Sequence, residues 1–128
     1  MSKSIPFSSL FNIQQNTNVI AGGSERVFYG KIPDSCVGFM NVVATVAWFS
    51  GVTYDIRVDG ESFSRIERDI TLANPLVYHP KLQIVVKDRI EVFASNSSTA
   101  TYTLGMLIDG IAFHKESMIG GMGYNLVP

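Results

Sequence analysis

Two histidines and one cysteine are the side chains of this sequence best suited to bind a metal or to act as nucleophiles. His79, His114 and Cys36 lie far apart in the chain, and none belongs to an H-x-H, H-E-x-x-H or C-x-x-C motif of the kind that holds zinc or forms a redox pair. A reactive thiol needs a base beside it, and the sequence indicates none near Cys36. We therefore expect no metal site, no cofactor and no thiol chemistry.

Pairs of acidic residues are the remaining candidates for catalysis. Glu61 with Glu67, or Asp88 with Glu91, could supply the two carboxyl groups of a glycosidase. Each pair lies beside Arg or Lys near a predicted turn, where surface carboxylates are common. A calcium-loop pattern begins at Asp55 but lacks the glutamate that such a loop needs at its twelfth position. We expect a protein that is not an enzyme.

The composition limits the classes of partner. The 128 residues suit one domain, and the net charge is −1 with Lys and Arg scattered, so nothing favours binding to nucleic acid. Charged residues make up 16% of the chain, whereas about 25% is typical. A surface this poor in charge predicts that partner chains cover part of it.

One stretch without charge, residues 35–54, organises the rest of the chain. Within it, residues 38–49 alternate as a central strand would, with Met40 and Ala44 on a wholly apolar side that faces the core. The other side carries Val43 and Thr45 and is too apolar to be fully exposed to water, so we expect another segment to cover it. The polar residues inside this stretch argue against a membrane span, and the chain begins without a signal-peptide pattern, which predicts synthesis in a cytoplasm.

Alternating apolar residues recur along the chain and are separated by turn signals. Asp59-Gly60 predicts a two-residue hairpin loop that pairs Ile56 with Phe63 and Tyr54 with Arg65, and Asp109-Gly110 predicts a second turn. About eight strands with almost no helix indicate an all-β fold, an antiparallel β-sandwich in which a jelly roll is the favoured form.

Two terminal arms are expected to extend from this sandwich. We predict an N-terminal arm at residues 1–23, the sandwich at 24–114, and a C-terminal arm at 115–128 that includes a glycine-rich joint. Each arm is either a frayed end laid partly on its own domain or an arm that docks on a neighbouring subunit. A disordered end rarely carries several large apolar side chains, and docking on neighbouring subunits is the alternative that we carry forward. The predicted contact residues are Phe7, Leu10, Phe11, Ile13, Tyr124, Leu126 and Val127.

The chain also resembles a known group of proteins in three stretches. These are Phe28-Tyr29-Gly30-Lys31-Ile32-Pro33, Val52-Thr53-Tyr54-Asp55-Ile56-Arg57-Val58-Asp59-Gly60-Glu61, and Asp88-Arg89-Ile90-Glu91-Val92-Phe93-Ala94-Ser95-Asn96. Together they resemble the small β-sandwich virion proteins of tailed bacteriophages, above all head decoration (cement) and related auxiliary proteins.

The resemblance implies a structural protein of the virion. Such a protein forms homo-oligomers, often trimers, and binds capsid or other virion proteins through its arms. An alternative stays open, a carbohydrate- or receptor-binding jelly-roll module of lectin-like or host-attachment type. The aromatic content and the Asn/Ser-rich loop at residues 95–98 motivate that alternative, with a glycan as the partner.

Overall fold

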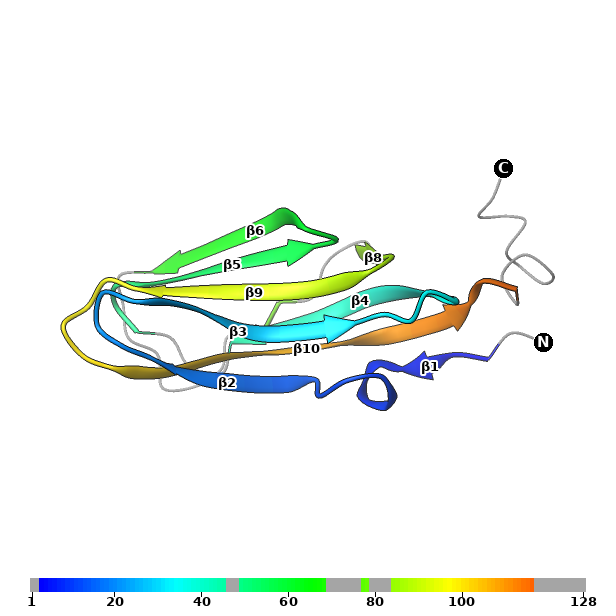
Figure 1. Cartoon of the computed structure of the whole chain (residues 1–128), viewed down its shortest axis with the longest axis horizontal. Helices are drawn as coiled ribbons and strands as arrows, with labels where there is room; N and C mark the ends of the chain where they lie inside the picture. Colours follow the sequence, from blue (N-terminus) through cyan, green and yellow to red (C-terminus); the bar gives the residue numbers. More distant parts are fainter. Residues whose placement is uncertain (1–2, 46–48, 69–76, 79–83, 117–128) are drawn as a thin grey trace.

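The computed structural model describes residues 3–45, 49–68, 77–78 and 84–116, which form two antiparallel sheets packed face to face (Figure 1). The first sheet, called sheet A, contains β1 (Ile5–Pro6), β2 (Gln14–Val19), β4 (Cys36–Thr45), β7 (Val77–Tyr78), β8 (Ile84–Val86) and β10 (Tyr102–His114). The second, sheet B, contains β3 (Ser24–Lys31), β5 (Val52–Val58), β6 (Glu61–Arg68) and β9 (Arg89–Asn96). A short 3-10 turn, η1 (Phe7–Ser9), joins β1 to β2.

The order of the strands confirms the predicted jelly roll. In sheet A the order is β2-β10-β4 with β7 and β8 on the far side of β4, and in sheet B it is β3-β9-β5-β6. The chain therefore changes sheet at β2–β3, β3–β4, β4–β5, β6–β7, β8–β9 and β9–β10. Sheet A has six strands but four strand positions, because β1 and β2 share one side of β10 and β7 and β8 share one side of β4. Two layers of four positions connected in this way define the double Greek key of a jelly roll.

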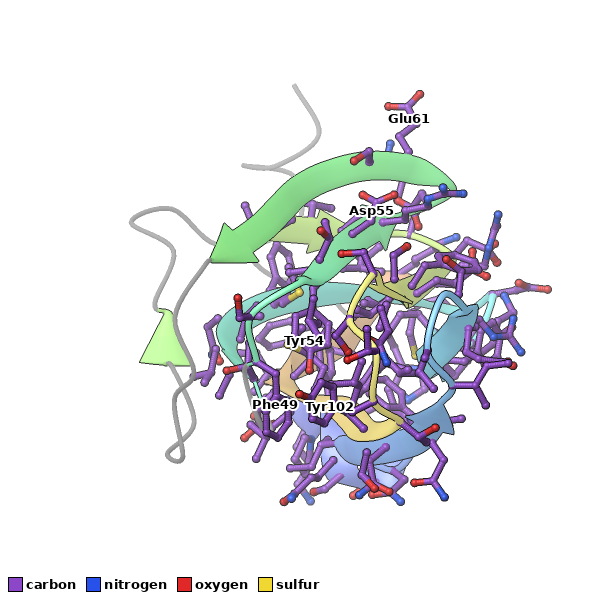
Figure 2. The ribbon with its side chains drawn as sticks, turned by 90° about the vertical axis from the view of Figure 1, so that its left-hand side faces the viewer. Phe49, Tyr54, Asp55, Glu61 and Tyr102 are labelled. Carbon is purple, nitrogen blue, oxygen red and sulfur yellow. The ribbon has the colours of Figure 1, made fainter. Side chains whose placement is uncertain are left out.

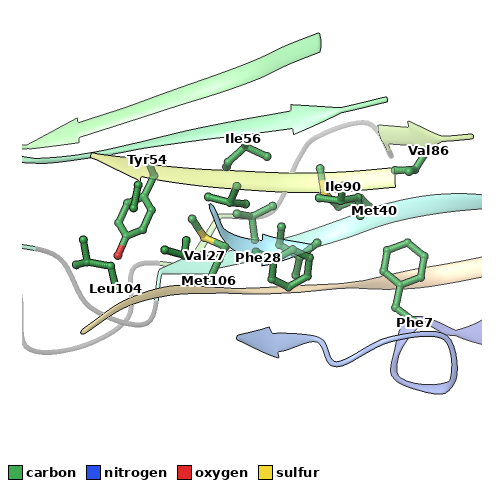
Figure 3. Close-up of a cluster of buried hydrophobic side chains, with 14 of the residues drawn as sticks. Phe7, Val27, Phe28, Met40, Tyr54, Ile56, Val86, Ile90, Leu104 and Met106 are labelled. Atoms are coloured by element: carbon green, nitrogen blue, oxygen red, sulfur yellow. The ribbon is translucent and has the colours of Figure 1, made fainter. Parts of the chain in front are cut away.

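The core lies between the two sheets and follows from the alternation of apolar side chains. On β10, Leu104, Met106, Ile108 and Ala112 are fully buried, and every second residue between them faces the other way. Sheet B contributes its own alternating set from β5 and β9. Figure 3 shows the side chains from both sheets meeting in one layer, Phe7, Val27, Phe28, Met40, Tyr54, Ile56, Val86, Ile90, Leu104 and Met106.

A β-bulge in β4 corrects the predicted facing of the central strand. Asp109 pairs with Val42 while Gly110 pairs with Met40, so Asn41 is an extra residue on β4. The extra residue reverses the alternation. Met40 faces the core before the bulge, and Val43 and Thr45 face it afterwards, each at most 1% exposed. The prediction that Val43 and Thr45 lie on the outer side is therefore wrong.

The predicted turn at Asp109-Gly110 is also wrong, because β10 continues through both residues to His114. Gly110 is needed for a close approach. A Cβ atom at this position would lie 2.2 Å from the Phe39 carbonyl oxygen and 2.7 Å from the Phe7 ring. The glycine thus makes room for the aromatic ring that fills this end of the core.

The hairpin at Asp59-Gly60 is confirmed. Both residues have positive φ, 55° and 88°, as a two-residue loop of type I′ requires. The predicted pairing is displaced by one residue, because Ile56 pairs with Ser64 and not with Phe63. A register shift between Ile56 and Arg57 is the cause, and the alternation alone gave no sign of it.

The segment expected to form an N-terminal arm is part of sheet A. β1 and β2 both pair with β10, and η1 places Phe7 in the core with 0% exposure. These pairings extend sheet A by an edge, so the described part of residues 1–23 belongs to the body of the domain. Of the predicted C-terminal arm, residues 117–128 lie outside the described residues.

The bulge in β4 leads to a prediction about two neighbouring positions. Thr45→Lys should destabilise the fold by at least about 3 kcal/mol, because it places an ammonium group in the core. In protein dilute enough to be monomeric, Val42→Lys should change the free energy of unfolding by less than about 1 kcal/mol, because Val42 is partly exposed on the outer side. Urea unfolding of both variants measures the difference, and equal destabilisation would contradict the bulge.

A second prediction concerns alkaline pH. Burial raises the pKa of Tyr54 to about 12, although a backbone hydrogen bond with Gly105 partly offsets the effect. A pKa that is higher in the folded than in the unfolded state adds stability below pH about 10, and that stability is lost as the pH rises through about 12. The stability lost between pH about 10 and 12 is about 3 kcal/mol.

Tyr54→Phe should therefore remove this loss between pH about 10 and 12, at a cost of about 1 kcal/mol at neutral pH for the hydrogen bond. Urea unfolding across this pH range tests it, with Tyr29→Phe as the control because Tyr29 is exposed. The same pH dependence in Tyr54→Phe and in the parent protein would contradict the prediction.

Candidate functional site

The outer side of sheet A carries a continuous set of apolar side chains, here called the apolar face. Cross-strand partners share a side of the sheet, so the register identifies its members. Phe39 and Phe113 make an edge-to-face contact on it, with ring centroids 5.9 Å apart. The apolar face consists of Val37, Phe39, Val42, Ala44, Val85, Leu107, Ile111 and Phe113.

This face is unusual for an antiparallel sheet, which commonly turns polar side chains outward when one side is solvated. Most of its members are partly exposed, and Val85 is 45% exposed. Among the described residues, no strand or turn packs on it, since sheet B lies on the opposite side of sheet A. One carboxylate, that of Asp109, lies on the same side of the sheet between Leu107 and Ile111, and it accepts a hydrogen bond from the backbone N–H of Gly110 at 2.8 Å.

The outer side of sheet B has the opposite character. A chain of ion pairs runs across β3 and β9, in which Arg26 pairs with Glu91, Glu91 with Arg89, Arg89 with Asp88 and Asp88 with Lys31. Guanidinium groups also lie over aromatic rings, Arg26 over Tyr29 at 4.5 Å. A surface of this kind is stable in water, so the contrast marks the apolar face as the side suited to a partner.

The acidic residues of this network are not arranged as a catalytic pair. Arg89 donates hydrogen bonds to Glu91 and to Asp88. The hydrogen bond from Arg89 holds the pKa of Glu91 below its ordinary value, and the hydrogen bonds from Lys31 first and then from Arg89 hold the pKa of Asp88 below its ordinary value. The general acid of a glycosidase needs a raised pKa instead. Asp55 accepts hydrogen bonds from Arg57 and Ser62, at 3.0 and 2.6 Å.

The end of the sandwich formed by the β4–β5 and β9–β10 loops carries an aromatic pair. Phe49 and Tyr102 stack with centroids 4.0 Å apart and an interplanar angle of 1°. Figure 2 shows this pair well separated from the carboxylates of Asp55 and Glu61. An aromatic groove between two facing acids, which a polysaccharide-active enzyme would need, is therefore not formed by these residues.

The Asn/Ser-rich loop beside that aromatic pair uses its polar groups internally. Asn96 is 1% exposed, and its amide donates to the carbonyl oxygens of Val19 and Ala100 at 3.0 and 2.8 Å. Its side-chain oxygen accepts hydrogen bonds from the N–H and the hydroxyl of Ser98. Asn96 therefore holds the β9–β10 loop in place and is not available to bind a sugar.

The structure places a base beside the cysteine, which the sequence did not predict. Pairing of β4 with β10 aligns Cys36 with His114, and Cys36 Sγ lies 3.6 Å from His114 Nδ1. The two residues are 78 positions apart, so no local pattern could reveal the pair. The thiol is 1% exposed and therefore closed to a substrate, so the contact is that of a buried side chain with its hydrogen-bond partner.

The predicted contact residues divide into two groups. Phe7 is fully buried, and Leu10, Phe11 and Ile13 are partly buried and pack against the core of their own chain. The Phe11 ring contacts those of Phe7 and Phe28, at centroid distances of 5.2 and 5.9 Å. Their role in binding a neighbour stays a prediction. The C-terminal group, Tyr124, Leu126 and Val127, lies outside the described residues.

The described residues contain no group of three or more His, Cys, Asp or Glu side chains placed to hold a metal ion. They also contain no helix long and apolar enough to cross a membrane.

Comparisons with known proteins add a structural likeness. No protein-family model and no curated protein matches the chain. Among solved structures, the infectious bursal disease virus Gt strain is similar with a TM-score of 0.45 and 9% identity, over 89% of this chain and 33% of that one. The VP2 subviral particle of the same virus gives a TM-score of 0.38 and 11% identity, over 89% and 32%.

A third similar structure, the crystal structure of FLHE, gives a TM-score of 0.43 and 10% identity, over 86% of this chain and 95% of that one. The chain thus spans about a third of the length of the viral chains and nearly all of FLHE. Every one of these TM-scores is below 0.5, so the likeness carries no argument about function.

Proposed function

We propose that this protein is a non-enzymatic structural subunit of a virus particle, which associates with copies of itself and with neighbouring virion proteins. The apolar face is the observation that carries the proposal. Eight apolar side chains lie around a single carboxylate on the outer side of one sheet, while the outer side of the other sheet carries a chain of ion pairs. Burial of such a face against a protein partner is the ordinary way to remove it from water.

The jelly-roll topology supports this function. Jelly rolls occur in viral capsid proteins, and also in lectins and cupins, so the fold alone does not decide among them. A low content of charged residues, 16%, suits a subunit whose surface is shared with others. The more specific form of the proposal is a capsid-decoration or auxiliary protein of a tailed bacteriophage, in an oligomer such as a trimer.

Self-association can be tested with one substitution on each outer surface. Ile111→Lys places a charge in the apolar face, whereas Tyr29→Lys places the same charge on the ion-paired side of sheet B. We expect the parent protein and Tyr29→Lys to be oligomers by sedimentation equilibrium, and Ile111→Lys to associate at least about 30-fold more weakly. Monomeric parent protein, or an unchanged Ile111→Lys oligomer, would contradict the proposal, as would absence of the protein from purified virus particles.

A glycan- or receptor-binding module is the second candidate function. The stacked Phe49 and Tyr102 rings favour it, because partly exposed aromatic rings at a loop end can pack against the apolar side of a sugar. A glycan array should then show binding that Tyr102→Ala reduces about tenfold. An array without any bound glycan would count against the sugar form of this candidate.

A further inference from the structure

The outer side of sheet A is arranged in four rows, each of which is a set of cross-strand partners. The first row contains Phe113 and Val37, the second Ile111, Phe39 and Val85, the third Asp109 and Val42, and the fourth Leu107 and Ala44. Successive rows are about 7 Å apart, because each lies two residues further along β10. In Figure 1 the first row lies at the right-hand end of β10. The second row is thus wholly apolar, and the carboxylate lies in the third.

Asp109 restricts what can cover this face. Its carboxylate accepts a hydrogen bond from the N–H of Gly110, and within the described part of the chain no cation forms an ion pair with it. Burial of a carboxylate under apolar groups is costly, and a cation that pairs with it offsets part of that cost. A suitable occupant therefore brings a positive charge to the third row and apolar side chains to the rows beside it.

A cation of this kind lies at the other end of the same face. Lys115 follows Phe113 by two residues, and its N–H donates to the carbonyl oxygen of Ser35 at 2.8 Å, which keeps it at the end of sheet A. Lys115 is exposed and forms no ion pair with another described residue. The surface thus carries an acid in its third row and a base just beyond its first row, on either side of the apolar second row.

A two-fold axis through the second row makes this surface complementary to itself. If the axis lies between two packed faces and is perpendicular to the strands, the second rows of the two copies meet, and the third row of each copy meets the first row of the other. Packed sheets are about 10 Å apart, so the Cα atoms of Asp109 in one copy and Lys115 in the other are about 12 Å apart. An aspartate and a long lysine side chain together bridge that distance. The symmetry repeats the pair on the other side of the axis.

We propose that two copies of this protein pack apolar face to apolar face in a two-fold dimer, with Lys115 of each copy paired with Asp109 of the other. The inference rests on the proposed function and names a second copy as the partner of the apolar face. Ile111 and Phe39 form the centre of the contact, and the two ion pairs fix its register. The contact joins two subunits, so a trimer would need another surface.

Exchange of the two charges tests this contact in the full-length protein. Asp109→Lys and Lys115→Glu should each weaken self-association at least about tenfold in sedimentation equilibrium, because each variant alone opposes like charges at both pairs. A mixture of the two variants should form a heterodimer as tight as the parent dimer within about threefold, because both of its pairs then join opposite charges. The double variant should regain the association of the parent protein for the same reason.

Glu61→Lys is the matched control. It makes the same change of charge as Asp109→Lys at an exposed position of sheet B, at the tip of the β5–β6 hairpin (Figure 2). Self-association of this variant should equal that of the parent protein, because the hairpin lies away from the apolar face. An equal loss in Glu61→Lys and Asp109→Lys would overturn the inference, since net charge alone would then explain both.

The remaining outcomes separate this inference from the proposed function. A parent dimer that neither charge change weakens would overturn the inference and leave the proposed function standing, and so would a mixture and a double variant that stay as weak as the single variants. A parent protein of three subunits would also overturn it. A monomeric parent protein, as it would be if residues 117–128 covered the face, would overturn the proposed self-association itself.

Circular dichroism checks that each variant is folded. If Asp109→Lys unfolds, Asp109→Asn replaces it, because the amide oxygen can still accept the N–H of Gly110. In the Asp109→Asn background, Lys115→Glu should weaken association by less than about threefold, since the charge that it would oppose is gone. A further loss of about tenfold in that background would overturn the pairing of the two residues.

Discussion

The pairing of β4 with β10 is the contact on which the rest of the structure depends. It joins the two long strands at the centre of sheet A, and the extra residue Asn41 divides it into two halves with opposite facing. Before the bulge Met40 enters the core, and after it Val43 and Thr45 do so. Gly110 on β10 has no side chain, so the backbones of β4 and β10 can come close together there and the Phe7 ring has room beside them. Both the core and the apolar face follow from this one arrangement.

The two outer surfaces show how differently the sheets meet their surroundings. The outward positions of sheet B carry ion pairs and guanidinium groups that lie over aromatic rings, and such exposed contacts are weakened by water and salt. These groups add little stability but keep that side wettable. The outward positions of sheet A instead carry Val, Leu, Ile and Phe. The described residues leave most of these side chains partly exposed to water, as on a surface that binds a partner.

Much of the fold could be predicted from the sequence because alternation and turn chemistry are local. The jelly roll, the Asp59-Gly60 hairpin and the central position of the charge-free strand all follow from such signals. The bulge at Asn41, the register of β5 with β6 and the reason for Gly110 depend on contacts between distant residues, which one sequence does not display. The Cys36–His114 pair was missed for the same reason.

The N-terminal residues illustrate a different limit. The large apolar side chains Phe7, Leu10, Phe11 and Ile13 indicated that the segment packs against protein, and the structure shows that it packs against its own core. Composition reveals the need for burial but not which chain provides it. The apolar face poses the same question for sheet A, where the described residues supply no cover.

The central claim is that this face is a protein interface, and methyl NMR over a dilution series tests it most directly. The methyl groups of Val42, Leu107 and Ile111 should change chemical shift between concentrated and dilute protein, because their partner leaves. Those of the core residues Ile90 and Val92 should not change. Face methyl groups whose shifts stay constant across the series, in a protein that remains folded, would contradict the account.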